Sequence, residues 1–183
     1  MEKYVEVIWK KSYLWWSFNM IFVILGTHER PFYRLVKEID NLSSKNKIKD
    51  KFIIQMGVTK YKFKSKKIKS YEYIPQKDFD KYLKNSKILI THGGAGSIMT
   101  GIRIRKPIIT VPRLSKFGEH VNDHQLQIVK EMEKHGAVDA VYDINKLFDS
   151  IRKSSKIKLK NIKKQKSPIF KIVDKKLGEW NKK

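Results

Sequence analysis

The sequence predicts an α/β fold in which a doubly wound parallel sheet carries helices on both faces. Short apolar runs alternate with segments whose apolar residues recur at helical spacing. The clearest unit is residues 87–114, KILITHGGAGSIMTGIRIRKPIITVPRL, in which an apolar run, a glycine-dense turn, a helix-like segment and a second apolar run follow one another. A connection of this length makes its two flanking strands parallel.

Residues 21–25 form the first expected strand, a continuous apolar run that ends at Gly26 and is typical of a central strand covered on both faces. Pro31 suits the start of the next helix. The apolar positions of that helix fall at helical spacing and are Phe32, Leu35, Val36 and Ile39. Residues 52–56 predict the second strand, which ends at Gly57.

The next stretch, residues 61–69, is rich in lysine and predicts a solvated loop or an edge strand. Residues 70–74 alternate as a short strand before Pro75. A helix then turns Phe79, Tyr82 and Leu83 inward, and it leads into the strand at residues 88–90. Ser97 is expected to open the helix of the central unit, which continues to residue 105, and residues 108–111 form the strand after it.

Beyond Pro112, residues 113–121 form a loop, and a helix with core-spaced apolar residues begins near Asn122. Asn122 can act as its N-cap with Gln125 at the capping-box position, and the helix ends near Gly136. Residues 137–142 predict the last strand and residues 144–151 a short helix. The domain organisation is therefore an extension at 1–19, one domain at 20–151 and a basic tail at 152–183.

Three interpretations of residues 1–19 stay open. Their tryptophans could form an interfacial anchor at a bilayer, they could dock a partner, or the true start could be Met20. The apolar run from residue 13 to residue 26 is shorter than a membrane span and has no small-residue cleavage site after it. The tail is expected either to be solvated or to lie on anionic lipid.

Composition limits the chemistry. The sequence has no cysteine, which excludes disulfides and thiolate sites, and its 5 histidines show no spacing typical of metal ligands, so we expect no metal and no cofactor. Its 41 Lys+Arg against 18 Asp+Glu give a net charge of +23, which attracts anionic partners. No aromatic-interleaved basic motif is present, so nucleic acid is a disfavoured partner.

The glycine-dense turn is either a phosphate-binding loop or a plain structural turn. Glycines let a backbone approach a ligand closely, and the free N–H groups at a helix start attract anions. Ser97 could cap that helix or bond the anion. The turn lacks the GxGxxG pattern of dinucleotide sites and the Gly-Lys-Ser/Thr ending of P-loops, so NAD binding and ATP hydrolysis are disfavoured. It shares the carboxyl edge of the sheet with the first loop, where ligands bind in such folds.

A family resemblance favours the first alternative. The string THGGAGSIMTGIRIRKPIITVPR, followed by FGEHVNDHQLQIVKEMEKHGAV, resembles the C-terminal, donor-binding half of the glycosyltransferase 28 family. Within it, the match is to small bacterial exopolysaccharide and capsule subunits (PssE-like or EpsF-like) that are similar to eukaryotic Alg13. The segment MIFVILGTHERPFYRLVKEID matches the start of those subunits, so the resemblance covers residues 20–147. It implies a Rossmann-like domain equivalent to the C-terminal half of a GT-B glycosyltransferase.

The resemblance implies a nucleotide-sugar site, with UDP-sugar as substrate. Its expected ligands come from the first loop, the glycine loop and the later helix start: Gly26, Thr27, His92, Gly93, Gly94, Ala95, Gly96, Ser97, Asp123, His124 and Gln125. His124 and Gln125 could equally serve in capping. Thr100 stands where relatives commonly place a glutamate for the ribose hydroxyls. Candidate acid/base groups lie on nearby loops and are His28, Glu29, Glu119 and His120, for each of which a binding or loop-structure role is an alternative.

The chain is too short to include the acceptor-binding half of a GT-B enzyme. The resemblance therefore implies a hexosyltransferase that is active with an Alg14-like membrane-associated partner and a lipid-linked acceptor, in the cytoplasm at the inner face of the plasma membrane. A non-catalytic enhancer that stabilises its partner is the second hypothesis. A basic nucleic-acid-binding protein is the third.

Overall fold

The computed structural model describes residues 19–121 and 124–155, except the side chain of His124. Its centre is a six-stranded sheet in the order β3-β2-β1-β4-β5-β6, with every neighbouring pair parallel. The strands are β1 Met20–Ile24, β2 Lys51–Gln55, β3 Ile68–Tyr71, β4 Ile88–Thr91, β5 Ile108–Thr110 and β6 Asp139–Ala140. The predicted doubly wound fold is confirmed.

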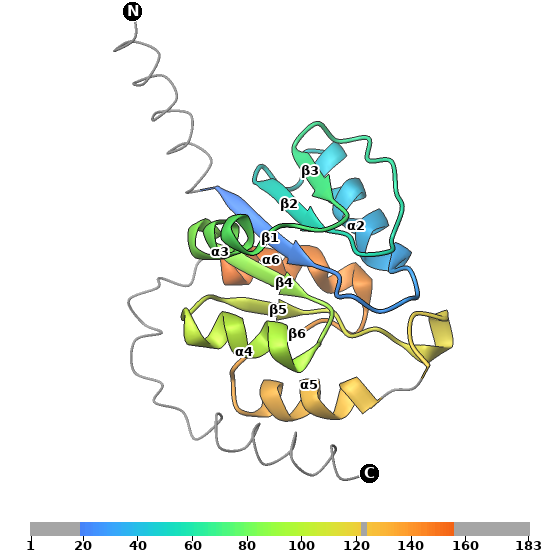
Figure 1. Cartoon of the computed structure of the whole chain (residues 1–183), viewed down its shortest axis with the longest axis vertical. Helices are drawn as coiled ribbons and strands as arrows, with labels where there is room; N and C mark the ends of the chain where they lie inside the picture. Colours follow the sequence, from blue (N-terminus) through green and yellow to red (C-terminus); the bar gives the residue numbers. More distant parts are fainter. Residues whose placement is uncertain (1–18, 122–123, 156–183) are drawn as a thin grey trace, which may run out of the picture.

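Helices cover both faces of this sheet (Figure 1). They are α2 Tyr33–Ser44, α3 Gln76–Asn85, α4 Ala95–Arg103, α5 His124–Lys134 and α6 Leu147–Ser154, with the 3-10 turns η1 Ser115–Phe117 and η2 Ile144–Lys146. Apolar side chains of α2 and α6 join one core cluster, and those of α3, α4 and α5 join the other. Successive residues of β1 alternate between the two clusters, as a strand buried on both faces requires.

The expected elements are present, with shifts at their ends. The third strand begins two residues and ends three residues earlier than expected, because β3 pairs Ile68 with Phe52 of β2 and ends at Tyr71. Pairing with β2 determines this register, and the register cannot be predicted from the local alternation of residues 70–74. The last strand is reduced to the two residues of β6, and the final helix continues to Ser154. The interpretations of residues 1–18 and of the tail from 156 lie outside the described residues.

The order of the strands determines where a ligand can bind. β1 lies between β2 and β4, so the connections that leave the carboxyl ends of β1 and β4 diverge to opposite faces of the sheet. A crevice opens at such a switch point in doubly wound sheets. The loop at Gly26 follows β1 and the loop at Gly93 follows β4. The two loops singled out from the sequence therefore meet at this edge.

Candidate functional site at the carboxyl edge of the sheet

The glycine loop leads directly into an uncapped helix start. Gly93 has φ +99°, and a Cβ there would come within 3.0 Å of Val129 of α5, so glycine is needed for both conformation and packing. Gly94 is the N-cap residue of α4 and supplies no side chain to cap it. Backbone N–H groups at the start of α4 are thus left for an anion.

Ser97 does not open this helix as expected. α4 begins at Ala95, which places Ser97 within the first turn, and no side-chain capping bond is present at the helix start. Glycine can occupy the N-cap position without a side-chain bond, and the backbone of the loop alone brings the chain into the helix here. Ser97 remains half-buried beside the same turn, which is compatible with a contact to a bound anion.

His92 is the side chain around which the two loops close. It is 9% exposed, and its Nδ1 atom lies 3.3 Å from the carbonyl oxygen of Ile24. A Cβ on Gly26 would lie 2.6 Å from the Nε2 atom of His92, and one on Gly94 would lie 2.5 Å from it. The imidazole therefore occupies the space that side chains at both glycines would need.

Burial lowers the pKa of His92 to about 4, although its bond to the Ile24 carbonyl opposes the shift. The ring is consequently neutral at pH 7. A neutral imidazole that donates from Nδ1 to the Ile24 carbonyl carries a lone pair on Nε2. His92 can then accept a hydrogen bond at the crevice, and the glycine backbones leave it room to do so.

The loop after β1 brings His28 against His120. Their ring centroids are 4.4 Å apart, so two candidate acid/base residues from distant parts of the chain lie side by side. The backbone N–H of Arg30 donates to Nδ1 of His28 at 3.1 Å. Neutral His28 thus carries its proton on Nε2, which makes it a donor to a ligand rather than a ready base. Burial, His120 and Arg113 together lower the pKa of His28.

Arg113 is a residue that the sequence interpretation missed. It is 1% exposed, and its Nη1 and Nη2 atoms donate to the carbonyl oxygens of Arg30 (2.7 Å), Glu119 (3.1 Å) and Leu25 (2.8 Å). Its guanidinium carbon lies 4.7 Å from the ring centroid of Phe32. Burial lowers its pKa to about 10, against the opposing effect of Glu119, so it stays charged at pH 7. A basic residue three positions after the end of a buried strand was the available signal.

Glu119 is held in a bidentate ion pair. Its two carboxylate oxygens accept from Nε and Nη2 of Arg34 at 2.9 and 2.8 Å, and one of them also accepts from the backbone N–H of Leu114. Arg34 additionally donates to the carbonyl of Pro112 at 2.8 Å. The pair fastens the 113–121 loop to α2. This arrangement favours the loop-structure role of Glu119 over the acid/base role.

The remaining candidates fall in different surroundings. Thr27 and Glu29 are exposed on the first loop, and Gly96 is exposed in α4. Thr100 donates to the carbonyl of Gly96 at 2.8 Å, one turn earlier in its own helix. The Oε1 atom of Gln125 is buried and has no hydrogen-bond partner in the described part of the chain. Asp123, the expected N-cap residue Asn122 and the side chain of His124 lie outside what the structure describes.

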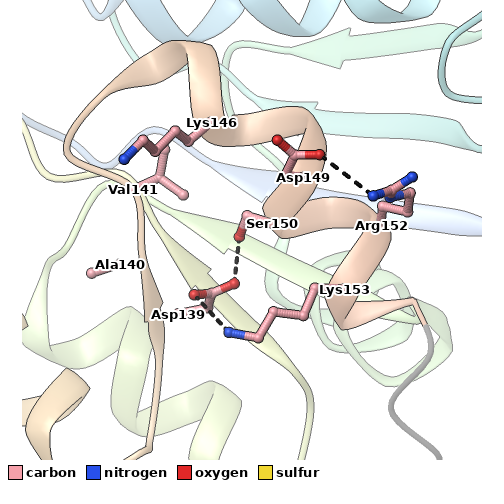
Figure 2. A pocket seen from close by; sticks show the side chains of 8 residues that line it. All are labelled: Asp139, Ala140, Val141, Lys146, Asp149, Ser150, Arg152 and Lys153. Atoms are coloured by element: carbon pink, nitrogen blue, oxygen red, sulfur yellow. Dashed lines mark hydrogen bonds and ion pairs between the residues drawn. The ribbon is translucent and has the colours of Figure 1, made fainter.

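A separate cavity of about 570 Å³ lies between β6 and α6 (Figure 2). Its charged groups mostly contact one another: Asp139 accepts from Ser150 at 2.7 Å and lies 3.6 Å from Lys153, while Asp149 lies 3.9 Å from Arg152. These contacts explain the charged residues of the cavity as structural pairs. Within residues 19–121 and 124–155, no three acidic or histidine side chains gather as metal ligands, and no helix is long and apolar enough to cross a membrane.

Residues 20–177 match the glycosyltransferase family 28 C-terminal domain. The chain belongs to this family. The match includes both loops of the crevice and the whole sheet, so the family-28 domain accounts for every described element. No curated protein matches the sequence.

Solved structures share the fold of this family-28 domain. The NMR structure of ALG13 superimposes with a TM-score of 0.54 at 20% identity, over 75% of this chain and 85% of that one. The calicheamicin glycosyltransferase CalG4 gives 0.64 at 10% identity, over 85% and 38%. The UDP-GlcNAc 2-epimerase of Methanocaldococcus jannaschii, in complex with UDP-GlcNAc and UDP, gives 0.57 at 18% identity, over 81% and 42%. The chain spans about two-fifths of the length of CalG4 and the epimerase.

Proposed function

We propose that this family-28 domain is the nucleotide-sugar-binding subunit of a heteromeric glycosyltransferase, with a UDP-sugar as its donor. The observation that carries the proposal is the enclosure of His92 between Gly26 and Gly94 beside the uncapped start of α4. Two loops that lie far apart in the sequence meet there and leave backbone donors unpaired. A diphosphate matches those backbone donors, because it offers several acceptor oxygens and negative charge. The Nε2 lone pair of His92 can instead accept from a hydroxyl of the donor.

Further groups suit the rest of such a donor. The unpaired Oε1 atom of Gln125 can accept a hydrogen bond from a sugar hydroxyl. His28 and buried Arg113 both contact the loop that follows β1, so the Nε2 proton of His28 and the charge of Arg113 lie at the carboxyl edge of the sheet. During transfer the diphosphate departs with increasing negative charge, and preorganised donors stabilise that charge without reorganising. Glu119 is committed to Arg34 and neutral His28 is a donor, so the proposal takes the base for the acceptor hydroxyl from a partner.

The acceptor side of the reaction is assigned to a partner. The chain covers 85% of the small ALG13 domain but about two-fifths of complete enzymes such as CalG4. We propose an Alg14-like, membrane-associated subunit that holds a lipid-linked acceptor and supplies the missing base. The process would be the assembly of an exopolysaccharide or capsule of the PssE/EpsF type, with this chain at the cytoplasmic membrane face through its partner. Hexosyl transfer would then require both subunits.

One observation favours a second candidate, an enhancer without a donor site of its own. The hydroxyl of Thr100 is used by the carbonyl of Gly96, and threonine cannot replace the charge of a glutamate at a ribose. An enhancer would need the fold and the partner-binding surface but no affinity for UDP.

Calorimetric titration of the purified chain with UDP separates the two candidates, with ATP and NAD as controls. The donor-site proposal expects saturable binding that prefers UDP and that His92→Ala weakens. Lys84→Ala, on the exposed side of α3, is the matched control and should bind as the wild type does. If UDP binds neither the chain alone nor the chain co-expressed with its membrane partner, the enhancer function replaces the proposal.

A further inference from the structure

The segment between β2 and β3 is a strongly basic loop with a regular pattern of exposure. From residue 60 to residue 66 the side chains alternate between exposed and half-buried, and every exposed position is a lysine: Lys60, Lys62, Lys64 and Lys66. We call residues 60–66 the lysine loop. The sequence from Val58 to Tyr71 contains no acidic residue that could neutralise it.

Buried contacts hold this loop in one conformation. The carboxylate of Asp40, which is 2% exposed, accepts from the Tyr61 hydroxyl (3.2 Å) and from the backbone N–H groups of Lys64 (3.1 Å) and Ser65 (3.0 Å). The hydroxyls of Ser65 and Ser43 lie 2.7 Å apart. These bonds tie the loop to α2, so its lysines are presented together from an ordered backbone.

The turn after α2 enlarges the basic surface. Lys45, Lys47 and Lys49 are exposed there, and Lys67 donates to the side chain of Asn46, which brings the turn against the lysine loop. The nearby carboxylate of Asp50 is already paired with Lys87 at 2.6 Å. The field of this face is therefore positive, and an anionic partner fits it.

We propose that the lysine loop docks the protein on an anionic lipid bilayer. The rings of Tyr61 and Phe63 pack edge to face, with centroids 5.0 Å apart, and turn toward the core, so they offer no stacking surface to nucleic-acid bases. Lysine is a point charge on a flexible stem, and such a group suits a fluid layer of headgroups better than it suits bidentate recognition. Val58, 44% exposed, adds an apolar side chain at the start of the same loop.

The start of the lysine loop lies beside the candidate site. The hydroxyl of Thr59 accepts from the backbone N–H of Phe32 at 3.0 Å, and Gly57 packs against the carbonyl of Gly26. The lysine loop is thus fastened to the first loop of the candidate site. This surface goes beyond the proposed donor site, and its value for a lipid-linked acceptor rests on the proposed function.

Co-sedimentation of the full-length chain with vesicles tests the inference. The vesicles contain phosphatidylcholine with phosphatidylglycerol, or phosphatidylcholine alone, at low and at high salt. Each lysine near an anionic surface contributes about 1 kcal/mol, which is about a fivefold change in partitioning. We therefore expect the combined variant K60Q/K62Q/K64Q/K66Q to lose at least about tenfold in binding to the anionic vesicles, after allowance for screening.

The matched control is K77Q/K84Q/K130Q/K134Q, which removes the same charge from exposed positions of α3 and α5 on the other face of the sheet. It should bind vesicles almost as the wild type does. Equal vesicle binding by the two variants would overturn the inference. So would retention of transfer RNA that outcompetes the vesicles and depends on the same lysines, because the loop would then serve nucleic acid.

The same proteins are titrated with UDP, so that the two proposals fail separately. The lysine-loop variant should keep the urea midpoint and the UDP affinity of the wild type. A chain that binds vesicles through this loop but no UDP would contradict the donor site alone. A chain that binds UDP and retains vesicle binding without the loop lysines would contradict the docking surface alone.

Discussion

The Nε2 atom of His92 lies 2.5 Å from the position that a Cβ atom on Gly94 would occupy. The ring cannot easily retreat, because its Nδ1 atom contacts the Ile24 carbonyl and Gly26 encloses it on the other side. Glycine at position 94 is therefore a consequence of histidine at position 92. The two residues should behave as a coupled pair.

Substitution of Gly94 tests that coupling. Gly94→Ala should lower the free energy of unfolding by about 1–3 kcal/mol, the usual cost of overpacking. In a His92→Ala background the same change should cost almost nothing, and urea unfolding of the four proteins of this cycle measures the difference. Gly96→Ala is the control, since a Cβ there meets nothing within 4 Å and should stabilise α4 by about 0.5–1 kcal/mol. Equal costs of Gly94→Ala in both backgrounds would contradict the coupling.

The lowered pKa of His92 predicts a specific pH dependence of stability. The unfolded chain takes up this proton near its ordinary pKa of 6.5, whereas the folded chain resists it down to about 4. Stability should therefore fall as the pH decreases from 6.5 toward 4, by about 2 kcal/mol between pH 7 and pH 5 from this residue. Urea unfolding at the two pH values checks it, with His92→Gln as the reference. If His92→Gln lost as much stability as the wild type between pH 7 and pH 5, the pH dependence would come from other groups.

The buried ion pair predicts an asymmetric cost. Arg34→Met leaves the carboxylate of Glu119, 4% exposed, without its cation, and should destabilise the fold by about 3–5 kcal/mol. Arg152→Met removes a partner of Asp149 from a pair in which both side chains are about two-thirds exposed, and should cost about 0–1 kcal/mol. Thermal unfolding of both variants supplies the comparison. Similar shifts in melting temperature would mean that Glu119 finds other partners.

The anchoring of the lysine loop predicts a local effect of Asp40. Asp40→Ala leaves the N–H groups of Lys64 and Ser65 without their acceptor, so hydrogen exchange at these two amides should accelerate well before global unfolding. Glu38→Ala, on the same helix, is the control, because that carboxylate accepts only from the side chain of Asn41 among the described bonds. Unchanged protection at residues 64 and 65 would show that the loop is held by other contacts.

The ribose position predicts a gain of affinity. Thr100→Glu would put a charge-assisted acceptor on the helix that follows the glycine loop, which is worth about 1 kcal/mol over a neutral bond, or about fivefold in UDP affinity. Arg103→Glu, on the last turn of α4, is a control for added negative charge and should not improve binding. Calorimetry on the two variants decides, and an unchanged UDP affinity of Thr100→Glu would remove this residue from the proposed site.

The periodicity of the side chains predicted most elements and their layering. Continuous apolar runs such as residues 21–25 are typical of strands covered on both faces, and the strand–glycine–helix unit of residues 87–114 predicted a parallel pair. Strand and helix type are local properties of side-chain periodicity, so one chain is enough to predict them. The glycine loop was singled out for the same reason.

Which side chains of those loops meet could not be read from any one segment and follows from the folded chain as a whole. His28 meets His120 from a distant part of the chain, and the bonds of Arg113 to the carbonyls of Arg30 and Leu25 span 83 and 88 positions. His92 is enclosed by Gly26, which lies in another loop, and by Gly94, its near neighbour. The same holds for β3, whose register follows from its pairing with β2. Contacts across a sheet depend on which strands become neighbours, and that choice is made by the packing of the whole core and not by any one segment.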